Sequence, residues 1–141
     1  MSNLSARSPA LFAVVAAVLA ASAAHAAAPP AADPAQTAYA TCMDKSDGTN
    51  PAWSVCGQAL VDAEEARLNA TWTKAYGDLE AKSKADLLAE ERAWIAYKDK
   101  SCLYLANGDF GREGQVVDYP NCRAGVIVER IKYLEAIGES G

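Results

Sequence analysis

Four cysteines, spread over most of the chain, constrain this sequence more than any other feature. They are Cys42, Cys56, Cys102 and Cys122, and the gaps between neighbours contain 13, 45 and 19 residues. Structural zinc sites usually take their cysteines from closely spaced pairs such as C-x-x-C, and the sequence contains no such pair. An even number of cysteines in a short exported chain is typical of a disulfide framework, so the sequence predicts two disulfides.

The N-terminal residues have the pattern of an export signal. Arg7 precedes an apolar run, residues 10–21, and Ala24-His25-Ala26 supplies the small residues of a cleavage site. The run is shorter than a membrane-spanning helix requires, so a retained N-terminal anchor is the less favoured alternative. We predict a periplasmic or secreted protein with a signal peptide at residues 1–26, a flexible leader at 27–32 and a single domain at 33–141.

The mature chain would be acidic and free of histidine. Cleavage after Ala26 removes Arg7 and His25, the only histidine, and leaves 18 acidic against 12 basic residues. Such a surface disfavours nucleic acid and anionic membranes, and it favours basic partners. Without histidine or a free thiol, no familiar nucleophile–base pair can be assembled, and no phosphate loop or haem motif occurs. We therefore predict no enzymatic activity, no cofactor, no metal site and no stable membrane insertion after cleavage.

Capping signals predict an all-α fold, a short N-terminal helix followed by a three-helix bundle. Asp33-Pro34 and Asn50-Pro51 each place a capping residue before a proline, and Ser83 begins a capping box. Asn107-Gly108 is a helix stop, and Asn121 is a candidate cap for the last helix, which Gly138 would close. The predicted helices are 33–44, 50–81, 83–106 and 122–137, with a fifteen-residue loop at 107–121.

Apolar residues at helical spacing predict the buried faces. The face of the second helix comprises Leu68, Trp72, Ala75, Tyr76 and Leu79. The face of the third comprises Leu87, Leu88, Trp94, Ile95, Cys102 and Leu105, with Tyr97 and Tyr104 along a second packed edge. The face of the last comprises Ile127, Ile131, Leu134 and Ile137.

Helix geometry limits how the cysteines can pair. Cys102 and Cys56 lie roughly 20 and 26 residues from the turn between the two long helices, which places them at heights that differ by roughly 10 Å. A disulfide needs Cα atoms about 4.4–6.8 Å apart, so this pair is disfavoured. We predict Cys42–Cys56 and Cys102–Cys122, and the alternative is Cys42–Cys102 with Cys56–Cys122.

Several charged residues need an interpretation. The adjacent carboxylates Glu64-Glu65 and Glu90-Glu91 are interpreted as solvated helix faces, because neighbours in a helix point about 100° apart. Glu91 and Lys98, however, fall within the apolar face of their helix, where an unpaired charge is costly. Three explanations compete: extension of the side chain to the surface, pairing with Arg67 or Arg130, or a ligand site. The first two are favoured.

The stretch from Glu91 to Cys102 (ERAWIAYKDKSC) resembles the signature of the LprI-like lysozyme-inhibitor family, which has the form Q-R-x-W-I-x-Y-R-D-x-x-C. Leu68 to Trp72 is similar to the family's L-N-x-x-Y element, and Cys122 with Arg130 is similar to its closing element. The resemblance covers about residues 41–137. It marks as structural signature residues Glu91, Arg92, Trp94, Tyr97, Lys98, Asp99 and Arg130.

The resemblance implies a small exported protein that binds and inhibits lysozyme. Animal lysozymes are basic, so an acidic inhibitor would be steered toward them. The predicted loop, tethered by Cys102–Cys122, is the candidate contact segment because long loops in compact domains are often functional. Its candidate contact residues are Asp109, Arg112, Glu113, Asp118 and Tyr119. The alternative is a structural or adaptor protein of the cell envelope that binds another exported protein.

Overall fold

A computed structural model describes residues 32–139. The predicted signal peptide, and all of the predicted leader except Ala32, lie outside these residues. The elements are α1 (Pro34–Lys45), α2 (Asn50–Gly77), α3 (Ala81–Lys100), α4 (Leu103–Ala106), α5 (Gly111–Glu113), the π-helix η1 (Gly114–Asp118) and α6 (Tyr119–Glu139). No strand occurs between residues 32 and 139, which confirms the all-α prediction: a short helix and three long ones.

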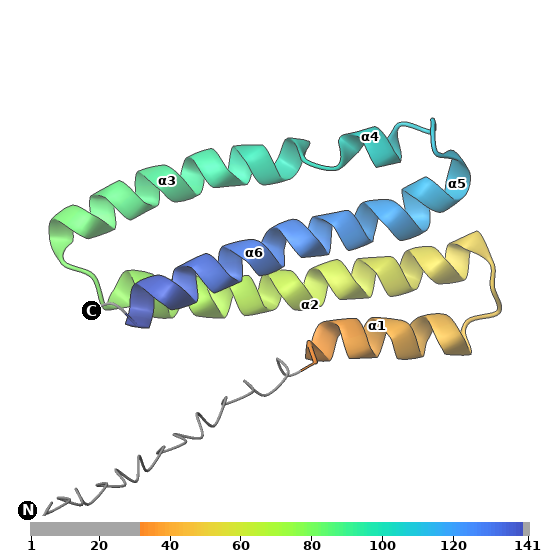
Figure 1. The fold of residues 1–141 in the computed structure, drawn as a ribbon, viewed down its shortest axis with the longest axis horizontal. Helices are drawn as coiled ribbons and strands as arrows, with labels where there is room; N and C mark the ends of the chain where they lie inside the picture. Colours follow the sequence, from red (N-terminus) through yellow and green to blue (C-terminus); the bar gives the residue numbers. More distant parts are fainter. Residues whose placement is uncertain (1–31, 140–141) are drawn as a thin grey trace, which may run out of the picture. The chain divides into compact units, whose positions relative to one another are not determined.

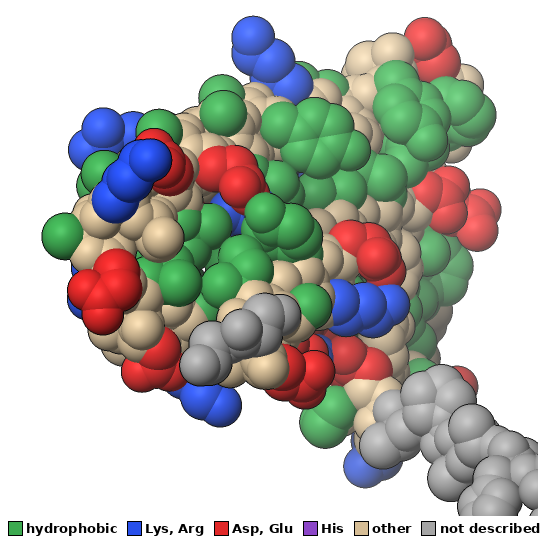
Figure 2. Space-filling view, turned by 60° about the vertical axis from the view of Figure 1, so that its left-hand side comes forward, with side chains coloured by type: hydrophobic (Ala, Val, Ile, Leu, Met, Phe, Trp, Pro, Cys, Tyr) green, Lys and Arg blue, Asp and Glu red, His purple; other side chains and the backbone are tan. Residues whose placement is uncertain are grey.

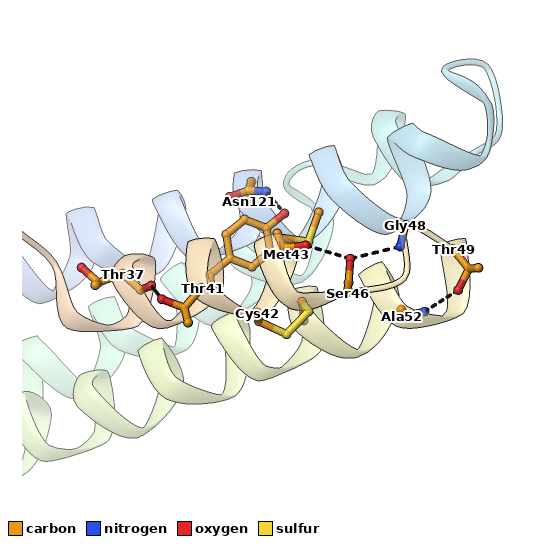
Figure 3. Close-up of a disulfide and its surroundings, with 11 residues drawn as sticks. Thr37, Thr41, Cys42, Met43, Ser46, Gly48, Thr49, Ala52 and Asn121 are labelled. Atoms are coloured by element: carbon orange, nitrogen blue, oxygen red, sulfur yellow. Dashed lines mark hydrogen bonds between the residues drawn. A yellow bond between two sulfur atoms is a disulfide. The ribbon is translucent and has the colours of Figure 1, made fainter.

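Helix α1 begins at its predicted capping residue, Asp33. The Asp33 carboxylate accepts hydrogen bonds from the backbone N–H groups of Ala35 (2.8 Å) and Gln36 (3.3 Å), and proline follows directly. Helix α2 is capped by Thr49, whose hydroxyl accepts from the backbone N–H of Ala52 at 3.4 Å, so the predicted cap Asn50 was wrong: it is the first residue of the helix. The Cys42–Cys56 disulfide then fastens α1 to α2 beside the turn that joins them, as Figure 3 shows.

Successive long helices run in opposite directions, and α6 lies between α2 and α3, parallel to α2 and antiparallel to α3 (Figure 1). The main core is formed by Leu68 and Ala75 of α2, Leu87 of α3, and a row on α6: Ile127, Ile131 and Leu134. These positions confirm the predicted faces of α2 and α6. A smaller cluster beneath α1 contains Ala35, Leu60 and Ala124.

Contacts of Gly57 and Asn121 hold α6 close to α2 and α1. A Cβ atom on Gly57 of α2 would lie 2.6 Å from Cγ of Pro120, so only glycine permits this approach. The Asn121 side chain donates to the hydroxyl of Tyr39 on α1 (2.9 Å) and to the carbonyl of Val117 (2.9 Å) (Figure 3). Asn121 is therefore an internal residue of α6, and its predicted role as a helix cap was wrong.

Other predicted boundaries were also wrong. The last helix is longer than predicted at both ends, because α6 starts at Tyr119 and passes through Gly138. Helix α3 starts at Ala81 after Glu80, which makes no side-chain capping bond, so Ser83 lies inside the helix. Lys84 instead secures this turn by donating to the carbonyl of Gly77 at 3.0 Å.

The prediction that Glu64 lies on a solvated face was wrong, because its side chain is fully buried. One carboxylate oxygen accepts from Arg67 at 2.8 Å, and Arg67 also donates to Asp33 at 2.5 Å. The other oxygen, Oε1, has no hydrogen-bond partner. Burial raises the pKa of Glu64, the Asp33 carboxylate adds to the rise, and Arg67 only partly offsets it.

Replacing Glu64 with glutamine should therefore stabilise the domain at neutral pH. A group whose pKa is raised on folding stabilises at low pH, and that contribution is lost as the pH rises through the folded-state pKa. The two proteins should be similar in stability at about pH 4, below the usual pKa of glutamate, and the variant should be the more stable of the two at about pH 7.5. Urea unfolding at the two pH values measures the difference, and an equal difference at both would contradict the explanation.

Candidate functional site

The chain between α3 and α6, residues 101–118, forms the end of the bundle opposite the α2–α3 turn (Figure 1). We call it the apical segment. The sequence predicted a continuous helix through Ala106, but α3 stops at Lys100, and Cys102 has a φ of 68°. Among the described residues, Cys102 is the one non-glycine residue with positive φ. This left-handed residue redirects the chain, and α4 begins directly after it.

The carboxyl end of α3 is fastened to α6. Cys102 is bonded to Cys122, with their Cα atoms 6.0 Å apart, and Arg123 donates to the carbonyl of Lys98. A cation at a helix carboxyl terminus also interacts favourably with the helix dipole. Both predicted disulfides, Cys42–Cys56 and Cys102–Cys122, are thereby confirmed. The Cys102–Cys122 disulfide fixes the base of the apical segment.

Most of the predicted loop is helical. Residues 111–118 form α5 and the π-helix η1, which runs directly into α6, and only residues 107–110 remain without helix. Proline inside a helix removes one backbone hydrogen bond and crowds the carbonyl four residues earlier, here that of Val116. The wider π turn immediately before Pro120 accommodates that change, and π turns are frequent at functional sites.

Hydrogen bonds inside the apical segment hold its short elements together. The Asn107 side chain accepts from the backbone N–H of Asp109 at 2.9 Å. Gln115 of η1 donates to the carbonyl of Ala106 in α4 at 3.1 Å, and it accepts from Arg112 at 2.9 Å. These bonds join α4, α5 and η1 into one unit that is rigid before any partner binds.

Gly114 allows the segment to fold back on itself. A Cβ atom at this position would lie 2.5 Å from the Cβ of Phe110 and 3.1 Å from the carbonyl oxygen of Leu105. The absence of a side chain therefore brings η1 against α4 and positions Phe110 beside it.

This packing leaves three apolar side chains exposed on the apical segment. Leu103, Tyr104 and Phe110 keep 47%, 59% and 56% of their surface accessible. The rings of Tyr104 and Phe110 meet edge to face with centroids 5.9 Å apart. We call these residues the apical hydrophobic cluster. Exposed apolar side chains gathered on a rigid projection are typical of a protein-binding surface.

The five predicted contact residues do not form one surface. Asp109, Arg112 and Glu113 are exposed on the α4–α5 part of the segment, alongside the hydrophobic cluster. Asp118 is exposed where η1 meets α6, and Tyr119 is half-buried there, in the wall of a polar hollow of about 400 Å³ that also contains Asp62 and Glu65 of α2. The segment was chosen for its length and its tethering by Cys102–Cys122, and the candidate contact residues did not include its exposed apolar side chains Leu103, Tyr104 and Phe110.

The signature residues lie mainly between α3 and α6. Arg130 is 6% exposed, and its guanidinium donates to Glu91 through Nε (3.0 Å) and Nη2 (2.7 Å) and to Glu90 through Nη1. Its carbon Cζ lies 5.5 Å from the Trp94 ring centroid and 4.9 Å from that of Tyr133. The predicted pairing of Glu91 with Arg130 is confirmed, and Glu91 does not lie on a solvated face. Glu90 and Glu91 instead converge on one cation.

The remaining signature residues have varied surroundings. Lys98 donates to Glu65 of α2 at 2.9 Å, so it is also paired. Asp99 lies 3.9 Å from Arg123. Arg92, Tyr97 and Ile95 are exposed, which makes the predicted burial of Ile95 and the packed edge at Tyr97 and Tyr104 wrong. The buried stripe of α3 is narrower than predicted, because α3 has a neighbouring helix, α6, on one side only (Figure 1).

Within residues 32–139, no group of three or more histidine, cysteine or carboxylate side chains is arranged to hold a metal ion. Nor does any helix in this range combine the length and apolar character needed to cross a membrane. This part of the chain does present exposed apolar and charged side chains that a partner could contact. On the face drawn in Figure 2, hydrophobic side chains reach the exterior between acidic and basic ones.

The chain was compared with known families, curated proteins and solved structures. A sequence model of the family described as "Lysozyme inhibitor LprI" matches residues 42–134. The match begins at the first cysteine and ends in the buried stripe of α6, so it covers both disulfides and the Glu91–Arg130 pair. No curated protein and no solved structure matches.

Proposed function

The chain belongs to the LprI family of lysozyme inhibitors, and on this basis we propose that it is an exported protein that blocks lysozyme with its apical segment. Residues 1–26, which lie outside the described residues, would direct export and be removed near Ala26. The mature domain would then act in the periplasm or outside the cell.

The apical hydrophobic cluster is the observation that carries this proposal. An inhibitor must present a projecting surface that fits a sugar-binding cleft, and a rigid projection loses little conformational entropy when it binds. The Cys102–Cys122 disulfide and the bonds of Gln115 supply that rigidity. Aromatic side chains such as Tyr104 and Phe110 are the residue types that most often dominate binding energy.

The net negative charge of the chain also supports lysozyme as the partner. The whole chain has a formal net charge of −5, and loss of Arg7 with the signal peptide makes the mature domain more acidic. Long-range attraction to a basic lysozyme would raise the association rate and fall with ionic strength. Asp109 and Glu113 place acidic groups next to the apical hydrophobic cluster, where they would meet the basic rim of the cleft.

The alternative is an adaptor of the cell envelope, with the same exposed cluster bound to a different exported protein. One titration separates the two functions. Lysis of a bacterial suspension by lysozyme should be lost as the mature protein, residues 27–141, is added to excess. Full lytic activity at about tenfold molar excess, with lysozyme above the dissociation constant of a useful inhibitor, would reject inhibition. Recovery of envelope proteins on the immobilised domain would then support the adaptor.

A further inference from the structure

A second open surface lies along the side of the bundle, between α3 and α6. It is a groove of about 430 Å³ whose walls include Trp94 and Tyr97 of α3, together with Gly125 and Tyr133 of α6. Arg130 and Glu129 complete it. This groove runs between two long helices, whereas the apical segment forms the end of the bundle (Figure 1).

The aromatic walls of this groove already contact cations of the chain itself. The Arg130 guanidinium lies over the rings of both Trp94 and Tyr133, and the Lys98 ammonium lies 5.8 Å from the Trp94 ring centroid. Two rings in the same groove remain partly accessible, because Tyr97 is 60% exposed and Tyr133, one face of which is covered by Arg130, is 46% exposed. A further cation could stack on the accessible part of these rings, as the Arg130 guanidinium already does on Trp94 and Tyr133.

The charges of the groove also favour a cation. Arg130 is fully committed to Glu90 and Glu91, so it offers little free positive charge to a ligand. Two carboxylates remain accessible at the edge, with Glu129 74% exposed and Glu90 45% exposed. Lys132 pairs with Glu129 but is itself 63% exposed, so a ligand can displace it at little cost.

We propose that the α3–α6 groove is a docking site for an arginine side chain presented by a basic protein partner. The aliphatic stem of the arginine would pack on Tyr97 and Tyr133, and its guanidinium would reach the carboxylate of Glu129. A sugar fits less well, because the strongest donor that lines the groove, Arg130, is already bonded to Glu90 and Glu91. This site is separate from the apical segment and does not require that the partner be lysozyme.

Two glycines provide a matched pair of variants. A Cβ atom at Gly125 or at Gly77 would meet nothing within 4 Å, so a side chain can be attached at either position without displacing a neighbour at Cβ. Gly125→Leu places the new side chain in the groove, and Gly77→Leu places it at the end of α2. Neither changes the charge, so neither alters the general attraction of an acidic protein for a basic peptide. Tyr97→Ala removes an exposed ring and serves as a second groove variant.

The probe is hexa-arginine peptide, titrated into the mature protein and followed by two-dimensional NMR of backbone amides and the Trp94 indole. The largest shifts should fall on Trp94, Tyr97, Gly125 and Tyr133, and Gly125→Leu and Tyr97→Ala should each weaken binding about tenfold. Gly77→Leu should bind as the wild type does, and thermal unfolding should show all three variants folded.

Other results would overturn the proposal. Equal binding by all four proteins, or shifts spread over the whole acidic surface, would show only non-specific attraction. A dimer of the wild type that Gly125→Leu dissociates would show that a second copy of the chain occupies the groove instead.

Discussion

Replacing Arg130 with methionine should lower the free energy of unfolding by about 3–5 kcal/mol, a large part of the stability of a domain of this size. Arg130 is the cation that faces the buried Glu91, and both are almost inaccessible to water. Without Arg130 the Glu91 carboxylate would remain buried with no compensating charge, and Trp94 and Tyr133 would lose the guanidinium between them. Urea unfolding of the two proteins measures the loss.

Two further variants test whether burial causes this effect. Glu91→Met combined with Arg130→Met removes both charges, so it should recover much of the loss, as an apolar replacement of a buried ion pair often does. Lys132→Met removes the cation of an exposed pair with Glu129 and should cost at most about 1 kcal/mol. If Arg130→Met costs no more than Lys132→Met, the ion pair is not a major determinant of the fold.

The predicted disulfide pairing is correct, but the height argument that disfavoured Cys56–Cys102 does not hold in the structure. Helix lengths and the position of the α2–α3 turn determine the height of each cysteine, and the rise per residue converts those counts into distances. In the structure the turn lies a few residues earlier than predicted, since α2 ends at Gly77 and α3 begins at Ala81. With these bounds Cys56 lies 21 residues before the end of α2 and Cys102 lies 21 residues after the start of α3, so the two are level and height does not exclude their pairing. They are kept apart because α6 lies between α2 and α3 (Figure 1).

The apical segment could not be predicted, because tertiary contacts there override local preference. Three glycines and a proline are typical of a loop, yet Gly114 and Pro120 lie in helical turns. The glycine is needed where η1 contacts α4, and the proline is needed where α6 meets Gly57. The break at Cys102 had no local signal either, since it occurs where the disulfide and Arg123 hold the end of α3 against α6.

The spacing of apolar residues also failed to predict which side chains are exposed. Tyr104 falls at helical spacing from Tyr97 and was therefore assigned to a packed edge, but both are exposed because α3 has a neighbour on only one side. Glu64 shows the opposite error. It lies four residues from both Leu60 and Leu68, and this spacing places it on the buried face of α2, but its charge led to its assignment to a solvated face.

If the apical hydrophobic cluster is the inhibitory surface, removing its two rings should abolish most of the inhibition. Tyr104→Ala with Phe110→Ala deletes side chains that are more than half exposed, so the stability cost should be limited to their mutual contact, about 0.5–1.5 kcal/mol. The matched control is Val55→Ala on α2, which removes an apolar side chain that is 68% exposed and far from α4 in sequence.

The most direct test is the inhibition constant of each protein against lysozyme, measured by titration of lytic activity. The double variant should inhibit at least about thirtyfold more weakly than the wild type, because binding hot spots contribute about 2 kcal/mol or more each. Val55→Ala should match the wild type, and circular dichroism should show all three folded. Inhibition by a folded double variant at wild-type strength would contradict the assignment of lysozyme binding to the apical segment.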